Sequence, residues 1–295
     1  MYYNYNNMTI KHLVISGGGP SMIQSLGAIQ HLCEEKYINI DEIESIYGTS
    51  AGAIVALIIC LKYDFETIYD FIIKRPWHNI FSVSVQNIFD AYTKKGLFDF
   101  NTIEKCFKPL LEAKDLSVNI TLEELYNYCK VELHFFSFEV NNFKLEDISY
   151  LTHPKLSALR AIAMTCGIPV LLTPIFFDGK CYVDGGMVCN YPLKYCMESG
   201  KNDDEILGMK NIFDTSEKNI VDADSNMLDF IMTFLYKVIY SLSIDHIQPT
   251  IKNEINLKTT LMSLNYYKKA LKSQDSRIEL YEDGIETAKK FLSSL

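Results

Sequence analysis

The sequence predicts an α/β fold, a three-layer α/β/α sandwich with a mostly parallel central sheet. Two short apolar segments near the N-terminus, Lys11–Ser16 and Ile43–Gly48, have the character of strands, and a helical pattern follows each of them. This strand–helix–strand–helix order is typical of parallel strands that are covered by helices. Apolar residues make up 48% of the 295 residues, which is enough to build a large core.

The two helices of this opening unit differ in their patterns. The first follows three consecutive glycines, Gly17, Gly18 and Gly19, and residues 21–37 then carry apolar side chains at helical spacing. The second, Ala51–Leu61, is apolar on every face, which is typical of a buried helix. We therefore expect the second helix to lie in the core.

The middle of the chain mixes helices with a strand and a hairpin. Residues 62–114 indicate mainly helices with loops, and Thr121 with Glu124 forms a capping box that starts another helix. Residues 132–140 are aromatic and β-rich, which predicts a strand. Residues 153–165 predict a helix with Pro154 near its first turn. Residues 174–186 predict a hairpin around Asp178-Gly179, a dipeptide favoured in two-residue turns.

The C-terminal part is predicted to complete one domain. Residues 205–210 suggest a last strand, residues 225–245 a long amphipathic helix, and residues 284–295 a closing helix. For the long helix, over Met227–Ser243, a membrane contact is the alternative, and we favour a helix that covers the core. No repeat or low-complexity linker interrupts the chain. We expect a single domain over residues 1–295, with core motifs over residues 11–193 and the C-terminal strand and covering helices over residues 201–295.

Charge and apolar runs limit the classes of function. The formal net charge is -9 and there is no basic tract, which argues against a nucleic-acid partner. The N-terminus lacks the pattern of a secretion signal, and the longest apolar run, Ala51–Leu61, is shorter than the roughly 20 residues that span a bilayer. We expect an intracellular protein with reduced cysteines, either soluble or peripherally bound to a membrane. The oligomeric state stays open.

Ser50 lies between a predicted strand and the buried helix, in the sequence Gly48-Thr-Ser-Ala-Gly52. Glycine tolerates strained dihedral angles and allows close approach of neighbouring backbone. The pattern Gly-x-Ser-x-Gly in a strand–turn–helix context is the signature of a nucleophile elbow. The sequence therefore makes Ser50 a candidate nucleophile.

A serine nucleophile needs a base and donors for the oxyanion. Gly17, Gly18 and Gly19 lie between a strand and a helix N-terminus, where backbone N–H groups form an anion site. A phosphate-binding loop or a plain tight turn is the alternative, although the segment matches neither GxGxxG nor a Walker sequence. An oxyanion hole is thus one of three interpretations of this segment.

Two candidates could supply the base. A Ser-Asp-His triad in the order of α/β-hydrolases needs a histidine after the acid, and only His246 lies late in the chain. Asp184 ends the predicted hairpin and precedes Gly185 and Gly186. An Asp-Gly pair is more often a turn than a catalytic site, so the residues alone leave the base open.

The combination of motifs resembles the patatin-like phospholipase family. The triple glycine, GTSAG and DGG occur in the family's order, and three further segments resemble it: ALRAIAMTCGIP, NYPL and GLFDFNTIEKCFKPLL. The closing GIETAKKFL is also similar. The patatin-like proteins of large DNA viruses look most similar, because their glycine motif also continues with proline. That likeness implies action in the cytoplasm of a host cell.

The resemblance implies a patatin-like fold and a Ser-Asp dyad. Ser50 would attack the ester, Asp184 would act directly as its base, and Gly17, Gly18 and Gly19 would form the oxyanion hole. The implied activity is that of a phospholipase A or lipid acyl hydrolase, which cleaves acyl esters of glycerophospholipids at a membrane surface through an acyl-enzyme. It implies no metal and no cofactor. We expect calcium independence as well, because the chain has no EF-hand-type loop.

The chain departs from the family pattern at Ser21 and Met22, where a basic residue and a glycine are usual. The departure supports one alternative, a catalytically weak lipid-binding or scaffold protein on the same fold. An esterase that uses Ser50, Asp184 and His246 is the other alternative. Residues 74–81, KRPWHNIF, combine cations with Trp77 and could touch a membrane. We favour packing of this segment on the core.

Overall fold

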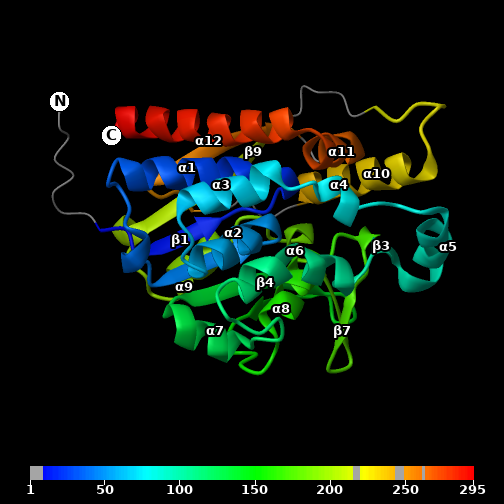
Figure 1. Ribbon diagram of the computed structural model, residues 1–295, viewed down its shortest axis with the longest axis horizontal. Helices are drawn as coiled ribbons and strands as arrows, with labels where there is room; N and C mark the ends of the chain where they lie inside the picture. The colour runs from blue at the N-terminus through cyan, green and yellow to red at the C-terminus, as the bar shows by residue number, and fades with distance from the viewer. Residues whose placement is uncertain (1–8, 215–219, 243–248, 261–262) are drawn as a thin grey trace.

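The structure is a computed structural model that describes residues 9–214, 220–242, 249–260 and 263–295 (Figure 1). Its main sheet has eight strands in the order β10-β9-β1-β2-β4-β8-β7, with β5 also paired to β4. The strands are β1 His12–Ile15, β2 Ser45–Thr49, β4 Glu132–Glu139, β5 Lys144–Ile148, β7 Ile175–Phe177, β8 Lys180–Asp184, β9 Ile206–Asp214 and β10 Glu254–Thr260. The pairs formed among β10, β9, β1, β2 and β4 are parallel, and β5, β7 and β8 add antiparallel pairs.

A two-stranded sheet and the helices surround this main sheet. The small sheet pairs β3 Gly96–Phe98 with β6 Val170–Leu172. The helices are α1 Met22–Glu34, α2 Ala51–Cys60, α3 Phe65–Lys74, α4 Trp77–Ile80, α5 Val85–Lys94, α6 Phe100–Glu112, α7 Leu122–Cys129, α8 Ala158–Thr165, α9 Leu193–Glu198, α10 Met227–Leu242, α11 Leu264–Lys272 and α12 Gln274–Ser294.

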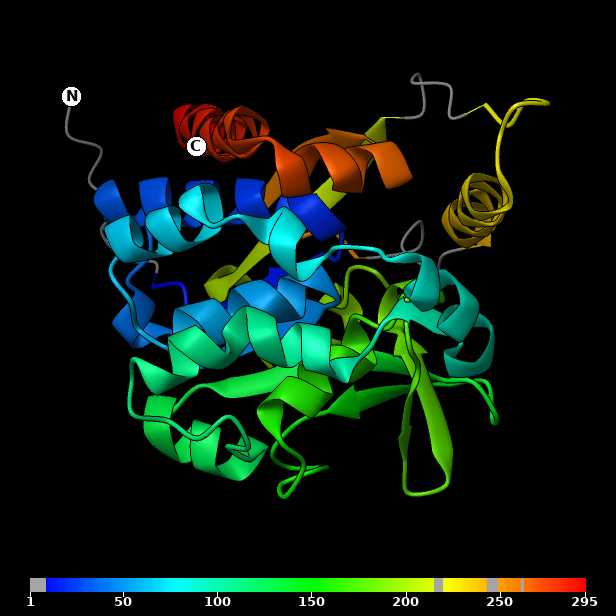
Figure 2. The same ribbon diagram turned by 45° about the vertical axis from the view of Figure 1, so that its right-hand side comes forward.

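Helices cover both faces of the main sheet, unequally. Leu13 and Ile15 of β1 face the larger core, which includes α1, α2, α6, α8 and α12. Val14 points to the other face and packs with Tyr47 and with Leu193 of α9. Figures 1 and 2 both show α1 and α12 side by side. The expected α/β/α layering with a mostly parallel sheet is confirmed, and its third layer is thin.

Two local predictions are confirmed in detail. Thr121 and Glu124 form the capping box of α7, each side chain bonding to the other's backbone N–H. The hairpin of β7 and β8 turns at Asp178 and Gly179, whose φ angles are 49° and 72°. Positive φ at both central residues is what a type I′ turn requires, and Asp-Gly supplies it.

The prediction that Pro154 lies in the first turn of a helix is wrong. Helix α8 begins at Ala158, after Ser157 caps it by accepting the backbone N–H of Arg160. The preceding segment contacts α7 instead. The carbonyl groups of Pro154 and Leu156 accept hydrogen bonds from the first turn of that helix, so the backbone there follows α7 and not a helix of its own.

The prediction that the strand at residues 205–210 is the last one is also wrong. That segment forms β9, and β10 follows it at the edge of the sheet. Ile255, Leu257 and Thr259 of β10 are buried and alternate with less buried residues, as in a strand with one covered face. This alternation is present in the sequence and is a signal that the prediction missed.

Helix α10 exists where the sequence predicts it, yet it does not cover the main core. Met232 and Tyr236 are buried and belong to a separate cluster with Leu171 and Leu264. The other apolar side chains of α10 between Met227 and Ser241 are half-buried or exposed. The expectation of a core-covering helix is therefore wrong, because α1, α2 and α12 already fill that position.

Across the ranges that the structure describes, no helix combines the length and the apolar character needed to cross a membrane.

Candidate active site

Ser50 stands at the turn between β2 and α2. Its φ and ψ of 52° and -121° lie outside the regions that L-residues usually adopt. Gly48 and Gly52 make this turn compatible with its surroundings: a Cβ on Gly52 would clash with the carbonyl of Ile15, and a Cβ on Gly48 would clash with the first turn of α2. The strained turn holds the hydroxyl at the carboxyl end of the parallel strands, where active sites of such sheets lie.

Strand β4 brings Asp184 to Ser50. Thr49 at the end of β2 pairs with Phe136, and Asp184 at the end of β8 pairs with the next residue, Ser137. The antiparallel β8 thus continues the line of β2 along β4 and ends against it. As a result, Ser50 Oγ donates a hydrogen bond to Asp184 Oδ2 at 2.6 Å.

The two glycines after Asp184 shape its second contact. Gly186 donates its backbone N–H to Asp184 Oδ1 at 2.8 Å. Gly185 lies so close to the carbonyl of Phe136 that any Cβ there would clash with it. The DGG sequence therefore presents one carboxylate oxygen to Ser50 and fixes the other.

Burial controls the protonation of Asp184. Ser50 and Asp184 are each only 6% exposed. Burial raises the pKa of Asp184 from 3.8 to about 7, while the hydrogen bonds from Ser50 and Gly186 act in the opposite direction. The result is a carboxyl group that can accept and release a proton near neutral pH.

Thr165 and Cys166 touch the same serine from the end of α8. The Thr165 hydroxyl accepts the backbone N–H of Ser50 at 2.8 Å and donates to the carbonyl of Phe136 at 2.6 Å. Burial, assisted by the charge of Asp184, raises the pKa of the Cys166 thiol well above its usual range. The thiol therefore stays protonated and does not compete with Ser50 as a nucleophile.

The triple glycine lies beside Ser50, but its three N–H groups are not equivalent. Gly17 packs against the Ser50 side chain and donates its N–H to the carbonyl of Asn190 at 3.1 Å, so that donor is already used. In the part of the chain that the structure describes, no acceptor is paired with the N–H of Gly18 or Gly19. The expectation of three free donors therefore fails for Gly17.

Neutral side chains brace this glycine turn. The carbonyl of Gly17 accepts from the side-chain amides of Asn190 and Asn211, at 2.9 and 2.8 Å. Asn211 also donates to Ser21 Oγ, which in turn donates to the carbonyl of Gly18. Ser21 thus joins a network of amide and hydroxyl groups that braces the glycine turn.

Two tyrosines close the site from the side of α10 and α11. Tyr267 of α11 packs on Gly19, where an added Cβ would meet its hydroxyl at 2.5 Å. The Tyr236 hydroxyl of α10 lies 3.5 Å from the Tyr267 hydroxyl. Burial raises the pKa of both phenols, and the charge of Asp184 adds to the shift in each case. The sequence offered no signal for either residue.

The histidines of the described residues do not contact this site. His12 Nδ1 lies 2.8 Å from Ser45 Oγ at the amino end of β2, and His134 pairs with Asp147 at 2.7 Å. His246, the candidate base of the alternative triad, lies outside the described residues.

The segment Lys74–Phe81 packs on the core, as favoured from the sequence. The Trp77 indole donates to the carbonyl of Ile72 at 2.8 Å and its ring packs partly buried against the main core. The Arg75 guanidinium lies over the Trp77 ring at 4.8 Å and donates to the carbonyl groups of Lys105 and Cys106. These contacts tie the segment to α6.

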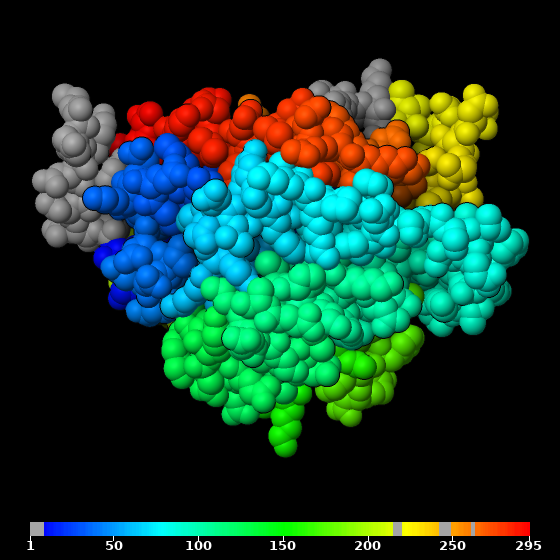
Figure 3. All heavy atoms as spheres, viewed as in Figure 1, coloured from blue at the N-terminus to red at the C-terminus, as the bar shows by residue number. Residues whose placement is uncertain are grey.

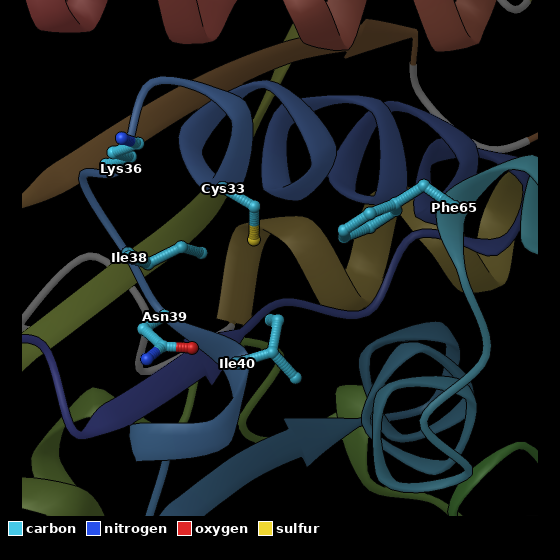
Figure 4. A pocket seen from close by; sticks show the side chains of 6 residues that line it. All are labelled: Cys33, Lys36, Ile38, Asn39, Ile40 and Phe65. Atoms are coloured by element: carbon cyan, nitrogen blue, oxygen red, sulfur yellow. The ribbon is translucent and has the colours of Figure 1, made fainter.

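A cavity of about 450 Å³ lies far from Ser50 (Figure 4). It is lined by Cys33, Lys36, Ile38, Asn39, Ile40 and Phe65. Helix α1 starts beside the glycine turn and reaches this cavity 13 residues later, a distance of about 20 Å. The cavity therefore sits at the amino ends of the strands and contains neither Ser50 nor Asp184.

Comparisons with known proteins agree with this geometry. The family profile described as patatin-like phospholipase matches residues 13–197. A probable lipid hydrolase of Invertebrate iridescent virus 6 is 26% identical over 217 residues, which are 71% of this chain and 73% of the relative. An uncharacterized protein of Acanthamoeba polyphaga mimivirus is 24% identical over 184 residues, which are 62% of this chain and 60% of that relative. The match thus spans less than two thirds of the mimivirus protein.

Among solved structures, VipD from Legionella pneumophila is similar in fold. The superposition has a TM-score of 0.58 at 17% identity and covers 97% of this chain and 67% of VipD.

Proposed function

The chain belongs to the patatin-like phospholipase family, and from that premise we propose that it hydrolyses fatty-acyl esters of glycerophospholipids with a Ser-Asp dyad. Lipid hydrolase activity is the coarser statement that the family and the iridescent virus relative support. The observation that carries the finer proposal is the 2.6 Å hydrogen bond from Ser50 Oγ to Asp184 Oδ2. A buried carboxylate in this contact can take the hydroxyl proton directly.

The proposed reaction has two halves. Ser50 Oγ attacks the ester carbonyl while its proton passes to Asp184, and the N–H groups of Gly18 and Gly19, with the N-terminus of α2, stabilise the oxyanion. Asp184 then gives the proton to the leaving alkoxide, which departs as a lysophospholipid and leaves an acyl-enzyme on Ser50. Water attacks the acyl-enzyme while Asp184 takes one of its protons. Asp184 then returns that proton to Ser50 Oγ as the bond between Ser50 and the acyl group breaks, which releases the fatty acid and restores the dyad.

The alternative triad finds less support. A histidine would act between the serine and the acid, but Ser50 and Asp184 are in direct contact and leave no gap for an imidazole ring. A catalytically weak lipid-binding protein remains the second alternative. A fluorophosphonate probe distinguishes it, because a folded scaffold would leave Ser50 unlabelled.

We propose that the reaction needs no calcium. The dyad supplies both nucleophile and base, and in the part of the chain described here no three His, Cys, Asp or Glu side chains converge as ligands for a metal. Turnover should therefore persist in excess chelator. Turnover that vanished with chelator and returned only with calcium would contradict this proposal.

Three variants test the dyad. Ser50→Ala, Asp184→Asn and the double variant should be about equally inactive and remain cooperatively folded, because a nucleophile and its base act as a unit. Removal of a general base typically costs about 10²–10⁴-fold in rate, measured here as kcat on phospholipid. An Asp184→Asn variant that keeps more than about a tenth of wild-type kcat would refute the assignment.

Asp178→Asn is the matched control. Asp178 is exposed, forms the turn of the same hairpin and has a φ of 49° that asparagine also tolerates. The variant should therefore keep normal turnover per folded molecule, and a large loss there would assign the effect of Asp184→Asn to the hairpin and not to the base.

A further inference from the structure

Helix α5 turns its apolar side toward solvent. Val85, Ile88, Phe89 and Tyr92 follow the spacing of one helical face, and all four are exposed, Phe89 by 73% and Tyr92 by 94%. No residue of α5 is buried. A surface helix of a globular protein normally buries its apolar stripe, so this helix is oriented for a partner that is itself apolar.

Helix α10 repeats the feature at the same end of the molecule. Phe230 and Phe234 are exposed by 51% and 60%, and their rings stack at 6.3 Å. Figures 1 and 2 show α5 and α10 near one another although more than a hundred residues separate them in sequence. In Figure 3 they form neighbouring parts of the right-hand surface. We call the residues Val85, Ile88, Phe89, Tyr92, Phe230 and Phe234 the docking face.

The docking face adjoins an apolar cluster that extends to the residues around Ser50. On the inner side of α10, Met232 and Tyr236 join an apolar cluster with Leu97 of β3, the strand that follows α5. The same cluster includes Tyr267, which packs on Gly19 beside Ser50. An acyl chain that enters over α5 and α10 would therefore remain in apolar surroundings on its way to the buried serine.

The charges on these two helices do not oppose an anionic surface. Residues 85–95 and 227–242 carry two aspartates, Asp90 and Asp229, against three lysines, Lys94, Lys95 and Lys237. The whole chain has a formal net charge of -9, so its acidity lies elsewhere. Lys94 Nζ forms an ion pair with Asp90 Oδ2 at 3.1 Å. The net charge carried by the two helices is therefore close to zero.

We propose that the docking face inserts into the surface of a phospholipid bilayer and delivers substrate from it to Ser50. The inference rests on the proposed function, since the substrate would be a lipid of that bilayer. A second copy of the chain fits the face less well, because it would cover the side from which the apolar cluster extends to Tyr267 and the buried serine. Interfacial binding follows from burial of apolar side chains at the headgroup boundary.

Flotation with lipid vesicles tests the proposal. The full chain carrying Ser50→Ala is mixed with vesicles of phosphatidylcholine, with and without phosphatidylserine, so that no lipid is consumed. Adding Phe89→Ser and Phe234→Ser should lower the bound fraction by roughly tenfold or more, because burial of two aromatic side chains is lost. Tyr128→Ser with Leu151→Ser is the matched control, since both residues are exposed and lie on α7 and after β5. That pair should keep binding.

A second measurement reports insertion directly. Phe89→Trp should show fluorescence that brominated phosphatidylcholine quenches, and Leu151→Trp should not. Equal binding by the docking-face pair and the control pair, or a docking face that mediates concentration-dependent dimers without vesicle binding, would overturn the inference. Vesicle binding through the docking face by a wild-type chain that hydrolyses no ester would refute the proposed function and the delivery of substrate, and would leave the membrane insertion of the docking face standing.

Discussion

Asp184 is a carboxyl group whose surroundings penalise its charge, and that penalty makes it a suitable base. Burial raises its pKa to about 7, and the hydrogen bonds from Ser50 and Gly186 reduce the shift without cancelling it. A general base works best when its pKa lies near the operating pH. The same burial costs stability, because the folded protein must hold a charge that the unfolded chain holds in water.

We expect kcat to rise with pH through one ionisation near pH 7, because only the carboxylate form of Asp184 accepts the proton of Ser50. A kcat that stays constant between about pH 5 and 9 would contradict the assignment of Asp184 as the base, because a single essential base gives a kcat that rises with pH and then levels off. The substrate should be a phospholipid whose headgroup does not ionise in that range, so that the pH dependence of kcat reports only on the enzyme.

The same group makes stability depend on pH. The pKa of Asp184 is about 7 in the folded state, compared with 3.8 for an unperturbed aspartate. Asp184 therefore makes its full contribution to the stability of the folded state below about pH 4. That contribution is lost progressively as the pH rises through about 7. Asp184→Asn should therefore raise the free energy of unfolding at pH 8, by about 4 kcal/mol at most, and by little at pH 4. Urea unfolding at both pH values measures this, and a variant less stable at pH 8 would indicate a structural role.

Thr165 is the positioning residue that the sequence motifs did not reveal. Thr165→Val keeps the shape and leaves two buried backbone groups, the Ser50 N–H and the Phe136 carbonyl, without partners. Each unpaired group costs about 1–3 kcal/mol. We expect kcat to fall by roughly tenfold or more with little change in KM, because the strained serine turn relaxes.

Thr165→Ser is the control, because it keeps the hydroxyl group that makes both bonds. It should retain most of wild-type kcat. Equal losses in the valine and serine variants would show that the methyl group, and not the hydroxyl, matters at this position.

Local sequence motifs predicted the site residues that lie in tight turns of the backbone. Ser50 and Asp184 are marked by neighbouring glycines, because their turns need close backbone approach. Thr165, Asn211 and Tyr267 carry no such mark. Each reaches the site through pairing or packing of distant segments, as in the contact of Asn211 with Gly17, and a local pattern does not encode such contacts.

At the scale of elements, the sequence predicts which segments form helices and strands better than it predicts what they face. Helix α5 shows why: its periodicity identifies an apolar side, but the structure is needed to show that Phe89 and Tyr92 on this side are exposed to solvent. Pro154 shows the limit at boundaries, since its segment hydrogen-bonds to the separate helix α7. The amphipathic pattern of α10 likewise says nothing about whether the core still has room for it.

The contact of α2 with β1 should be intolerant of any side chain. A Cβ on Gly52 would clash with the backbone carbonyl of Ile15, which cannot rotate away as a side chain would. Gly52→Ala should therefore displace α2 and Ser50, lower the free energy of unfolding by about 1–3 kcal/mol or more, and abolish most turnover.

Gly200→Ala is the comparison for this variant. Nothing lies within 4 Å of its added Cβ, and its φ of 81° costs only about 1–2 kcal/mol. Turnover per folded molecule should stay normal, and thermal unfolding with activity measurements separates the two variants. A fully active Gly52→Ala would show that the elbow does not need this close approach.

At the scale of the whole molecule, the two ends of the chain are built into one structure. Strand β1 lies between β2 and β9, so the C-terminal part shares the sheet with the motifs around Ser50. Helix α12 packs along α1, and the two helices touch through glycines: a Cβ on Gly27 would clash with the carbonyl of Tyr281, and one on Gly284 with that of Gln24. On these contacts we propose that residues 1–295 form a single domain.

If the chain is a single domain, it should unfold in a single transition. Substitutions near either end of the sequence should then shift the temperature of that whole transition. Gly27→Ala and Gly284→Ala alter the same helix crossing from opposite ends of the sequence, and each should lower the stability of the whole protein by about 1–3 kcal/mol or more. Their effects should not add, because the first substitution already separates the helices. Calorimetry should give one transition whose calorimetric and van't Hoff enthalpies agree in the two single variants and in the double variant. The single-domain proposal would fail if Gly284→Ala produced a separate early transition while the structure around Ser50 still melted at the wild-type temperature. Fluorophosphonate labelling of Ser50 follows that second transition. The C-terminal part would then be an independent unit.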